Sequence, residues 1–159
     1  MTDIALVTGG SRGIGAATAT LLAAQDILVV VNYRTNKQAA EQLVKDIQAQ
    51  GDQAVAYQAD IANEHEVEQL FTFIDSLPGE LIMLVNNAGM LMQQSPVESL
   101  TAQRINKVLS NNVTSYFLCC REAIKRMAIK HGGQGGAIVN VSSAASRLGA
   151  PFEYVDYAA

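Results

Sequence analysis

The chain has 159 residues, of which 49% are hydrophobic and 16% charged, with a formal net charge of −4. This length and apolar content predict one domain with a sizeable core, and the acidic balance disfavours nucleic acid and anionic membranes as partners. The longest apolar runs, Ile27–Val31 and Leu81–Val85, are five residues each, whereas a membrane-spanning helix needs about 20. Both runs are therefore interpreted as buried strands.

The amino terminus indicates a cytoplasmic protein, and the two cysteines are interpreted as reduced and structural. Met-Thr-Asp leads almost directly into an apolar run and lacks the basic and apolar regions of a signal peptide. Cys119 and Cys120 are adjacent in a predicted helix, where successive side chains diverge and a disulfide is geometrically poor. We expect reduced cysteines and no metal cluster.

Strands and helices alternate along the chain. Apolar runs predict strands over 4–7, 27–31, 54–58, 81–85 and 137–141, and helical spacing of apolar residues predicts helices over 16–24, 37–50, 63–77 and 101–130. Such alternation is typical of a parallel sheet with right-handed crossovers and helices on both faces. The sequence therefore predicts an α/β fold with a doubly wound parallel sheet.

The longest predicted helix begins after Thr101 as N-cap and runs to about Lys130. Asn112 lies on its apolar stripe, where a buried amide is costly unless it is hydrogen-bonded. It is therefore either a satisfied core asparagine or a residue that holds a water or a side chain in a cleft. Asn111 is turned about 100° away and is expected to be more exposed. The stripe comprises Ile105, Val108, Leu109, Val113, Tyr116, Phe117, Cys120, Ile124 and Met127.

A glycine-rich stretch, Thr8–Gly15, joins the first strand to the first helix. Glycines allow a ligand to approach the backbone, and the following helix presents unpaired N–H groups and a positive dipole end to an anion. Two readings follow from the stretch alone: a tight turn that requires positive φ, or a phosphate-binding turn.

Polar or glycine residues follow all five predicted strands. In an open parallel sheet, ligands bind beyond the carboxyl ends of the strands. These residues therefore outline a cleft along one edge of the sheet. They are Thr8-Gly9, Asn32-Tyr33-Arg34, Asp60, Asn86-Asn87-Ala88-Gly89 and Ser142-Ser143.

These motifs resemble those of the short-chain dehydrogenases/reductases. Thr8-Gly9-x-x-x-Gly13-x-Gly15 is similar to the cofactor turn of that family, and Asn86-Asn87-Ala88-Gly89 to its second signature. Asn112, Ser143 and Tyr157 resemble its helix asparagine, catalytic serine and catalytic tyrosine. The resemblance spans the chain. It implies that residues 1–159 form a single NAD(P)-binding Rossmann-like domain with the first five of an expected seven strands.

The resemblance also implies an oxidoreductase that moves a hydride between a nicotinamide and a small carbonyl or secondary-alcohol substrate. Tyr157 would act as general acid or base, Ser143 would hydrogen-bond the substrate oxygen, and Asn112 would hold a water in the proton relay. No metal is implied. The expected cofactor-binding residues are Gly9, Ser11, Arg12, Gly13, Ile14, Gly15, Asn32, Tyr33, Arg34, Asp60, Ile61, Asn86, Ala88 and Gly89.

The residues after the second strand favour NADP(H), with NAD(H) as second choice. An acidic residue there binds the ribose 2′-hydroxyl of NAD, whereas a nearby arginine accommodates the 2′-phosphate of NADP. This chain has Asn32 at that position, so no carboxylate repels a phosphate. Arg34 and Arg12 could supply planar donor groups, although both could equally be solvated surface side chains.

The family's lysine stands four residues after the tyrosine, at position 161, and this chain ends at Ala159. Tyr154 is a competing tyrosine, but the Tyr-Ala-Ala context favours Tyr157.

Because the family's lysine would lie beyond Ala159, we expect a piece of a longer enzyme that is inactive by itself. The resemblance implies that the intact form is a homotetramer built partly on helix 101–130. The alternatives are a catalytically silent nucleotide-binding protein and, fitting less well, a methyltransferase or sugar-nucleotide epimerase. Met90, Leu91 and Met92 predict only an apolar wall for the substrate.

Overall fold

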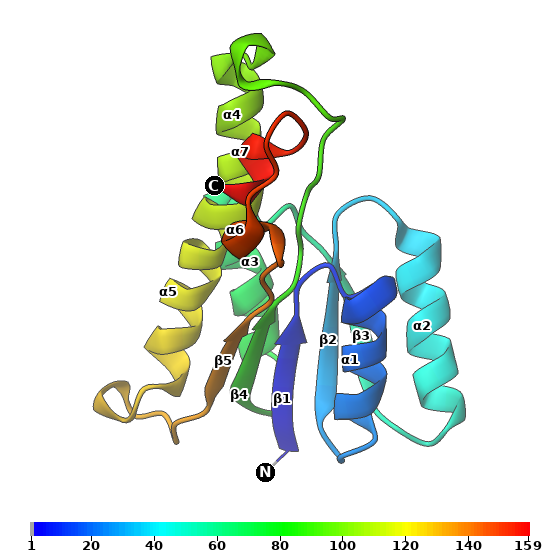
Figure 1. Ribbon diagram of the computed structural model, residues 1–159. Coiled ribbons are helices and arrows are strands. Elements are labelled where there is room, and N and C mark those ends of the chain that lie inside the picture. Colours follow the sequence, from blue (N-terminus) through cyan, green and yellow to red (C-terminus); the bar gives the residue numbers. More distant parts are fainter. Residues whose placement is uncertain (1) are drawn as a thin grey trace.

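Five parallel strands form one sheet in the computed structural model, which describes residues 2–159 (Figure 1). The strand order is β3-β2-β1-β4-β5, with Val7 of β1 opposite Val31 of β2 and Val85 of β4. This arrangement confirms the predicted α/β, Rossmann-like fold. The strands are β1 (Thr2–Val7), β2 (Leu28–Tyr33), β3 (Ala54–Gln58), β4 (Gly79–Asn86) and β5 (Ala137–Asn140).

Helices cover both faces of the sheet (Figure 1). Helices α1 and α2 pack on one face, and α3 and α5 on the other. The short helices α6 and α7 lie beyond the carboxyl ends of the strands, where α7 contacts both α6 and α4 (Figure 1). The helices are α1 (Gly13–Ala23), α2 (Lys37–Ala49), α3 (Glu64–Asp75), α4 (Ala102–Leu109), α5 (Ser115–Met127), α6 (Ala145–Leu148) and α7 (Val155–Ala158).

The core divides between the two faces because successive strand residues point to opposite sides of a sheet. Ile4 and Leu6 pack toward α3 and α5, while Val7, Val29 and Val31 pack toward α1 and α2. Each fully buried side chain of this size contributes about 1.5–3 kcal/mol relative to an exposed one. The sheet therefore forms a firm base for the loops that leave its carboxyl edge.

Two strands extend further at their carboxyl ends than the sequence predicted. Asn32 and Tyr33 belong to β2, where they pair with Tyr57 and Gln58 of β3, and Asn86 belongs to β4, opposite Asn140 of β5. The prediction that these residues lie in the exit loops was wrong. The prediction ended each strand where its apolar run ends. Backbone pairing with the neighbouring strand continues past that point and includes the polar residues.

The predicted helix from Thr101 to Lys130 is interrupted. A π-helical turn at Ser110–Thr114 separates α4 from α5, and α5 ends at Met127, after which Ala128 is extended. A π-helical turn adds a residue to the turn and so rotates the residues that follow it against a regular 3.6-residue period.

The predicted apolar stripe was only partly right. Of its members, Val108 and Met127 are buried, whereas Ile105, Leu109, Val113, Phe117 and Ile124 are exposed. The buried positions of α5 other than Met127 carry smaller or polar residues instead, namely Ser115, Cys119, Glu122 and Ala123. Apolar residues occupy two adjacent faces of this helix, and only one of them packs on the sheet.

A charged network joins α5 to α3. The buried Glu122 accepts hydrogen bonds from Lys125 (2.8 Å), Arg126 (3.1 Å) and Arg121 (3.0 Å). Burial disfavours the Glu122 carboxylate, but these bonds outweigh it and lower the pKa of Glu122 below its ordinary value. Arg126 also forms a bidentate pair with Asp75 of α3. The network therefore holds two helices together on one face of the sheet.

The cysteines are both free thiols, with Cys119 buried. Burial, together with Cys120 and Glu122, raises the pKa of Cys119 to about 12, which makes its thiol unreactive. Across residues 2–159, none of the helices is long and apolar enough to cross a membrane.

Candidate functional site

Thr8 ties the end of β1 to the end of β4. Its hydroxyl oxygen accepts hydrogen bonds from the backbone N–H groups of Asn87 (3.0 Å) and Ala88 (3.1 Å), and its hydroxyl donates to the Val85 carbonyl (3.4 Å). The residue is fully buried. One side chain therefore satisfies two loop N–H groups that have no partner in the sheet.

Two glycines, one in the turn after β1 and one in the first turn of α1, are required by close contact with the loop after β4. Gly9 has φ +59°, and a Cβ there would lie 2.9 Å from Cα of Ala88. A Cβ on Gly15 would lie 2.5 Å from Nδ2 of Asn87, which donates to the carbonyls of Thr8 (2.9 Å) and Gly9 (3.2 Å). The glycine spacing thus serves the contact between the two loops as well as any ligand.

Asn32 supports the same turn from below. Its Oδ1 accepts from the Gly9 N–H (3.3 Å) and its Nδ2 donates to the Ala59 carbonyl (3.0 Å). The residue is only 2% exposed. The Asn32 amide therefore links the exits of β1, β2 and β3, and does not extend into solvent beside Arg34.

A cleft of about 690 Å³ opens at this edge of the sheet. Ten of the fourteen predicted cofactor residues line it: Gly9, Ser11, Arg12, Gly13, Ile14, Tyr33, Arg34, Ile61, Ala88 and Gly89. The structure thus gathers residues from the exits of four strands around one space, which is the position that doubly wound folds use for ligands.

The other four predicted residues do not line the cleft. Gly15 and Asn32 lie beneath the turn, for the packing reasons given above. Asn86 is fully buried, and its Nδ2 donates to Oδ1 of Asn140 (2.9 Å) and to the Cys120 sulfur (3.3 Å). Asp60 stands outside the lining, with Oδ2 3.7 Å from Nη1 of Arg34. These four residues therefore contact neighbouring loops, strands or side chains and do not line the cleft.

Six lining residues were not among the predicted site residues: Thr35, Asn36, Asn87, Met90, Leu91 and Asn111. Thr35 and Asn36 follow Arg34 directly, so continuing the loop to the α2 N-cap would have found them. Asn111 was expected to be the more exposed of the asparagine pair, yet its Oδ1 accepts from Nη1 of Arg34 (3.2 Å). Arg34 and Asn111 are far apart in the chain, so the spacing of apolar residues along the sequence could not predict their contact.

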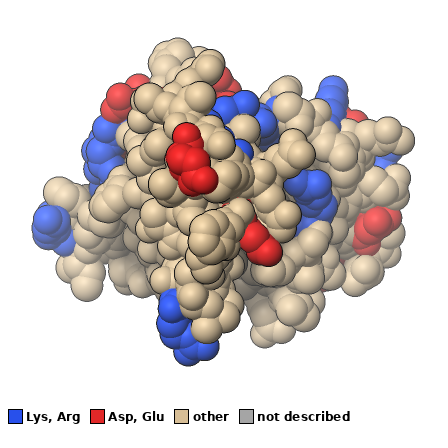
Figure 2. Space-filling model, turned by 45° about the horizontal axis from the view of Figure 1, so that its top comes forward, with Lys and Arg blue, Asp and Glu red and all other residues tan. Residues whose placement is uncertain are grey.

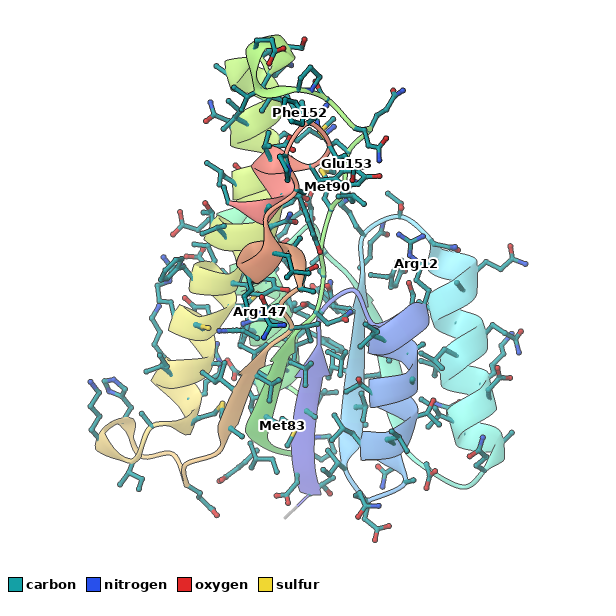
Figure 3. All side chains as sticks on the ribbon, in the orientation of Figure 1. Arg12, Met83, Met90, Arg147, Phe152 and Glu153 are labelled. Carbon is teal, nitrogen blue, oxygen red and sulfur yellow. The ribbon has the colours of Figure 1, made fainter. Side chains whose placement is uncertain are left out.

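Two arginines supply the charge of the cleft. The lining residues include Arg12 and Arg34 and, within the described part of the chain, no carboxylate. Arg12 lies at the start of α1, across the cleft from Met90 (Figure 3), and forms no ion pair with any residue of 2–159. On the face that Figure 2 brings forward, charged side chains stand in separate groups on a mainly uncharged surface. The cleft is thus suited to a ligand with localised negative charge.

The three predicted catalytic residues lie at the same edge of the sheet but outside the cleft lining. Asn112, in the π-helical turn, bonds the backbone of the lining residue Met90. Ser143 follows β5, and its Oγ accepts from the Ala145 N–H (3.2 Å). Tyr157 is half-buried in α7.

A third tyrosine, Tyr116 of α5, lies near Tyr157. Burial is the largest cause, and the nearby Tyr157 and Cys119 add to it, in raising the pKa of Tyr116 to about 12. The Tyr116 hydroxyl donates a hydrogen bond to the Val141 carbonyl.

Residues 2–159 contain no group of three or more His, Cys, Asp or Glu side chains arranged to hold a metal ion.

The family model for short chain dehydrogenases matches residues 3–159. The chain therefore belongs to the short-chain dehydrogenase family of oxidoreductases, in agreement with the sheet order and the loops at its edge, and the methyltransferase alternative is set aside.

Its relatives are longer than this chain. Uncharacterized oxidoreductase YgfF of Escherichia coli (strain K12) is 63% identical over 156 residues, which cover 98% of this chain and 63% of the relative. The 3-oxoacyl-[acyl-carrier-protein] reductase of Synechocystis sp. (strain ATCC 27184 / PCC 6803 / Kazusa) is 40% identical over 150 residues, 94% of this chain and 59% of the relative. A short chain dehydrogenase from Burkholderia cenocepacia J2315, crystallised in complex with NADP, matches with a TM-score of 0.88 at 35% identity, over 97% of this chain and 60% of that chain.

Proposed function

We propose that residues 1–159 form a single domain that binds NADP(H) and belongs to an oxidoreductase acting on a carbonyl or secondary-alcohol substrate. The observation that carries this proposal is the cleft lined by Arg12 and Arg34 at the start of α1. The family membership and the NADP complex of a relative with 35% identity support it.

The turn after β1 fits a pyrophosphate. Helix α1 begins at Gly13, and the first N–H groups of a helix have no intrahelical acceptor. The first backbone bond of this helix runs from Ala16 to the Arg12 carbonyl (3.2 Å), which leaves the preceding N–H groups available to an anion. Because Gly9 and Gly13 have no side chains, a ligand can lie directly on this backbone.

The preference for NADP(H) over NAD(H) rests on Arg34 and Arg12. A guanidinium binds phosphate through two parallel hydrogen bonds, and no lining carboxylate opposes a 2′-phosphate among the described residues. Arg34 is held by Asn111 and Asp60 at the side of the cleft. Asn32 cannot take the role that an acidic residue plays toward a ribose, because its amide is occupied by Gly9 and Ala59.

In the proposed reaction, Tyr157 donates its hydroxyl proton to the carbonyl oxygen during reduction and accepts it back during oxidation. The Ser143 hydroxyl donates a hydrogen bond to the same oxygen. Bound nicotinamide supplies or takes up the hydride. Asn112 holds a relay water: its Oδ1 has a second lone pair beyond the one that Met90 uses.

The intact protein is proposed to be a cytoplasmic homotetramer. An apolar face on α4, α5 and the π-helical turn between them supports self-association, since large exposed apolar patches mark interfaces. It comprises Ile105, Leu109, Val113, Phe117 and Ile124. Phe117 is 73% exposed, so Phe117→Glu should shift the whole gene product to smaller species in analytical sedimentation. An unchanged tetramer in that variant would show that the interface lies elsewhere.

The experiment that tests the proposal measures NADPH and NADH oxidation by the whole gene product over a panel of ketones and aldehydes. The expected result is turnover that prefers NADPH and falls at least 100-fold in Tyr157→Phe, which keeps the ring but loses the proton. A preference for NADH overturns the cofactor assignment. NADPH binding without any turnover would favour the second candidate, a catalytically silent nucleotide-binding protein. The observation that supports this candidate is that Ser143 and Tyr157 lie outside the cleft lining.

A further inference from the structure

Arg104 of α4 and Asp156 of α7 form a bidentate ion pair. Nε of Arg104 lies 2.7 Å from Oδ2 of Asp156, and Nη2 lies 3.2 Å from Oδ1. The side chains are 15% and 3% exposed, respectively. Parallel hydrogen bonds of this kind define orientation as well as distance, so the pair sets how α7 sits against α4.

The segment after β5 has few other attachments. Among residues 142–159, Asp156 alone is buried, so the segment adds no buried apolar side chain to the core. Its remaining side-chain hydrogen bonds, from Ser142, Ser143 and Ser146, stay within the segment. A short backbone bridge pairs Ser95 with Tyr154 and includes a bond from the Ser95 N–H to the Glu153 carbonyl (2.8 Å); it is the other hydrogen-bonded contact with the rest of the described chain. The ion pair is thus the main side-chain anchor of this segment.

The anchor joins two elements that carry proposed catalytic residues. Asp156 directly precedes Tyr157, and Arg104 stands about two helical turns before Asn112 on the same helical rod. The backbone of Arg104 is itself fixed, because its N–H donates to Oγ1 of the N-cap Thr101 (3.2 Å). A displacement of Asp156 would therefore move Tyr157 relative to Asn112.

We propose that Arg104 and Asp156 are positioning residues that hold Tyr157 in its working place relative to Asn112 and Ser143. The proposal rests on the proposed function, since it assumes that Tyr157 is the acid or base. Both residues lie outside the lining of the cleft, so the pair should affect the proton transfer and leave cofactor binding unchanged. A purely structural pair would instead reduce both together.

The first test compares Asp156→Asn with Glu153→Gln in the whole gene product. The two changes each remove one carboxylate, but the Glu153 side chain is exposed and forms no ion pair among residues 2–159 (Figure 3). We expect Asp156→Asn to lower kcat at least tenfold with KM for NADPH within twofold of the wild type, and Glu153→Gln to match the wild type. Arg104→Lys, which keeps the charge and loses the bidentate geometry, should give an intermediate kcat. Wild-type kcat in Asp156→Asn, or a parallel loss of NADPH binding, overturns the proposal.

The second test uses no substrate and measures backbone hydrogen exchange in the same variants. The N–H groups of Tyr157 and Ala158, which donate to the Tyr154 carbonyl, should exchange at least tenfold faster in Asp156→Asn, with the turn after β1 unchanged. If the wild type reduces no carbonyl, the proposed function fails, while faster exchange confined to α7 still supports the anchor. Unchanged exchange in α7 overturns the anchor even if the wild type is active.

Discussion

Asn112 binds the backbone of Met90 with both ends of its amide. The Met90 N–H donates to Oδ1 (2.7 Å), and Nδ2 donates to the Met90 carbonyl (2.9 Å). The asparagine is therefore a satisfied, half-buried residue, and at the same time it fixes the loop that forms one wall of the cleft. Of the two alternatives that the sequence left open, a hydrogen-bonded asparagine agrees with these contacts. A role in holding a water or a side chain stays a prediction.

Asn112→Ala should release that loop. Each hydrogen bond contributes a net free energy of about 1 kcal/mol, so the free energy of unfolding should fall by about 1–3 kcal/mol, and the Met90 N–H should exchange faster. Urea titration and hydrogen exchange measure these effects. Asn106→Ala, at an exposed position of α4, is the control; an equal effect in both variants would contradict the role of the amide.

Thr8→Val should destabilise the fold although it preserves the shape of the side chain. It removes the acceptor of the Asn87 and Ala88 N–H groups, and an unsatisfied buried donor costs about 1–3 kcal/mol. We expect a loss of about 2–4 kcal/mol in the free energy of unfolding by urea. Thr8→Ser retains the hydroxyl and should lose much less, so equal losses in the two variants would show that the methyl group matters more.

Arg34→Ala should weaken discrimination between the two nicotinamide cofactors. Loss of a guanidinium that binds phosphate is expected to raise KM for NADPH about tenfold, while KM for NADH changes little. Asn111→Ala should produce a smaller change in the same direction, because Asn111 orients Arg34. Lys37→Ala removes a nearby exposed charge that does not line the cleft. If Lys37→Ala raises KM for NADPH as much as Arg34→Ala does, the preference for NADPH over NADH comes from the positive charge of this region and not from the Arg34 guanidinium.

Glu122 should contribute to stability at neutral pH and lose that contribution in acid. Because its pKa is lowered in the folded state, its contribution is complete above the unfolded pKa of about 4.3 and disappears as pH falls through the folded pKa. Glu122→Gln leaves three cations around an uncharged amide, and should cost about 2–4 kcal/mol of unfolding free energy at pH 7.

The difference between the wild type and Glu122→Gln should shrink below about pH 4. Guanidinium titrations from pH 7 to pH 3 measure it. Glu41→Gln breaks an exposed pair with Lys37 and should change stability by less than about 0.5 kcal/mol. A pH-independent difference for Glu122→Gln would mean that the carboxylate is not the group that stabilises the network.

Local patterns were sufficient for the order of elements and for most of the cleft. Apolar runs and helical spacing located all five strands and helices α1 to α3, because those signals depend on neighbouring residues alone. They predicted α4 and α5 as one helix and did not find the π-helical turn between them. The short helices α6 and α7 were not predicted, since four residues carry no periodicity. The turn from Thr8 to Gly15 was also identified, and glycine is required there by contacts at Gly9 and Gly15 that the sequence does not display.

The sequence by itself determined the alternation of strands and helices, the glycine turn and the presence of polar residues at the sheet edge. Only the tertiary structure decided which of those residues line the cleft. Backbone pairing carried Asn32 and Asn86 into the sheet, and a π-helical turn placed Asn111 against Arg34. The partner of Asp156 was likewise decided by packing, since Arg104 lies 52 residues away in the chain. These contacts join distant segments, and no local period encodes them.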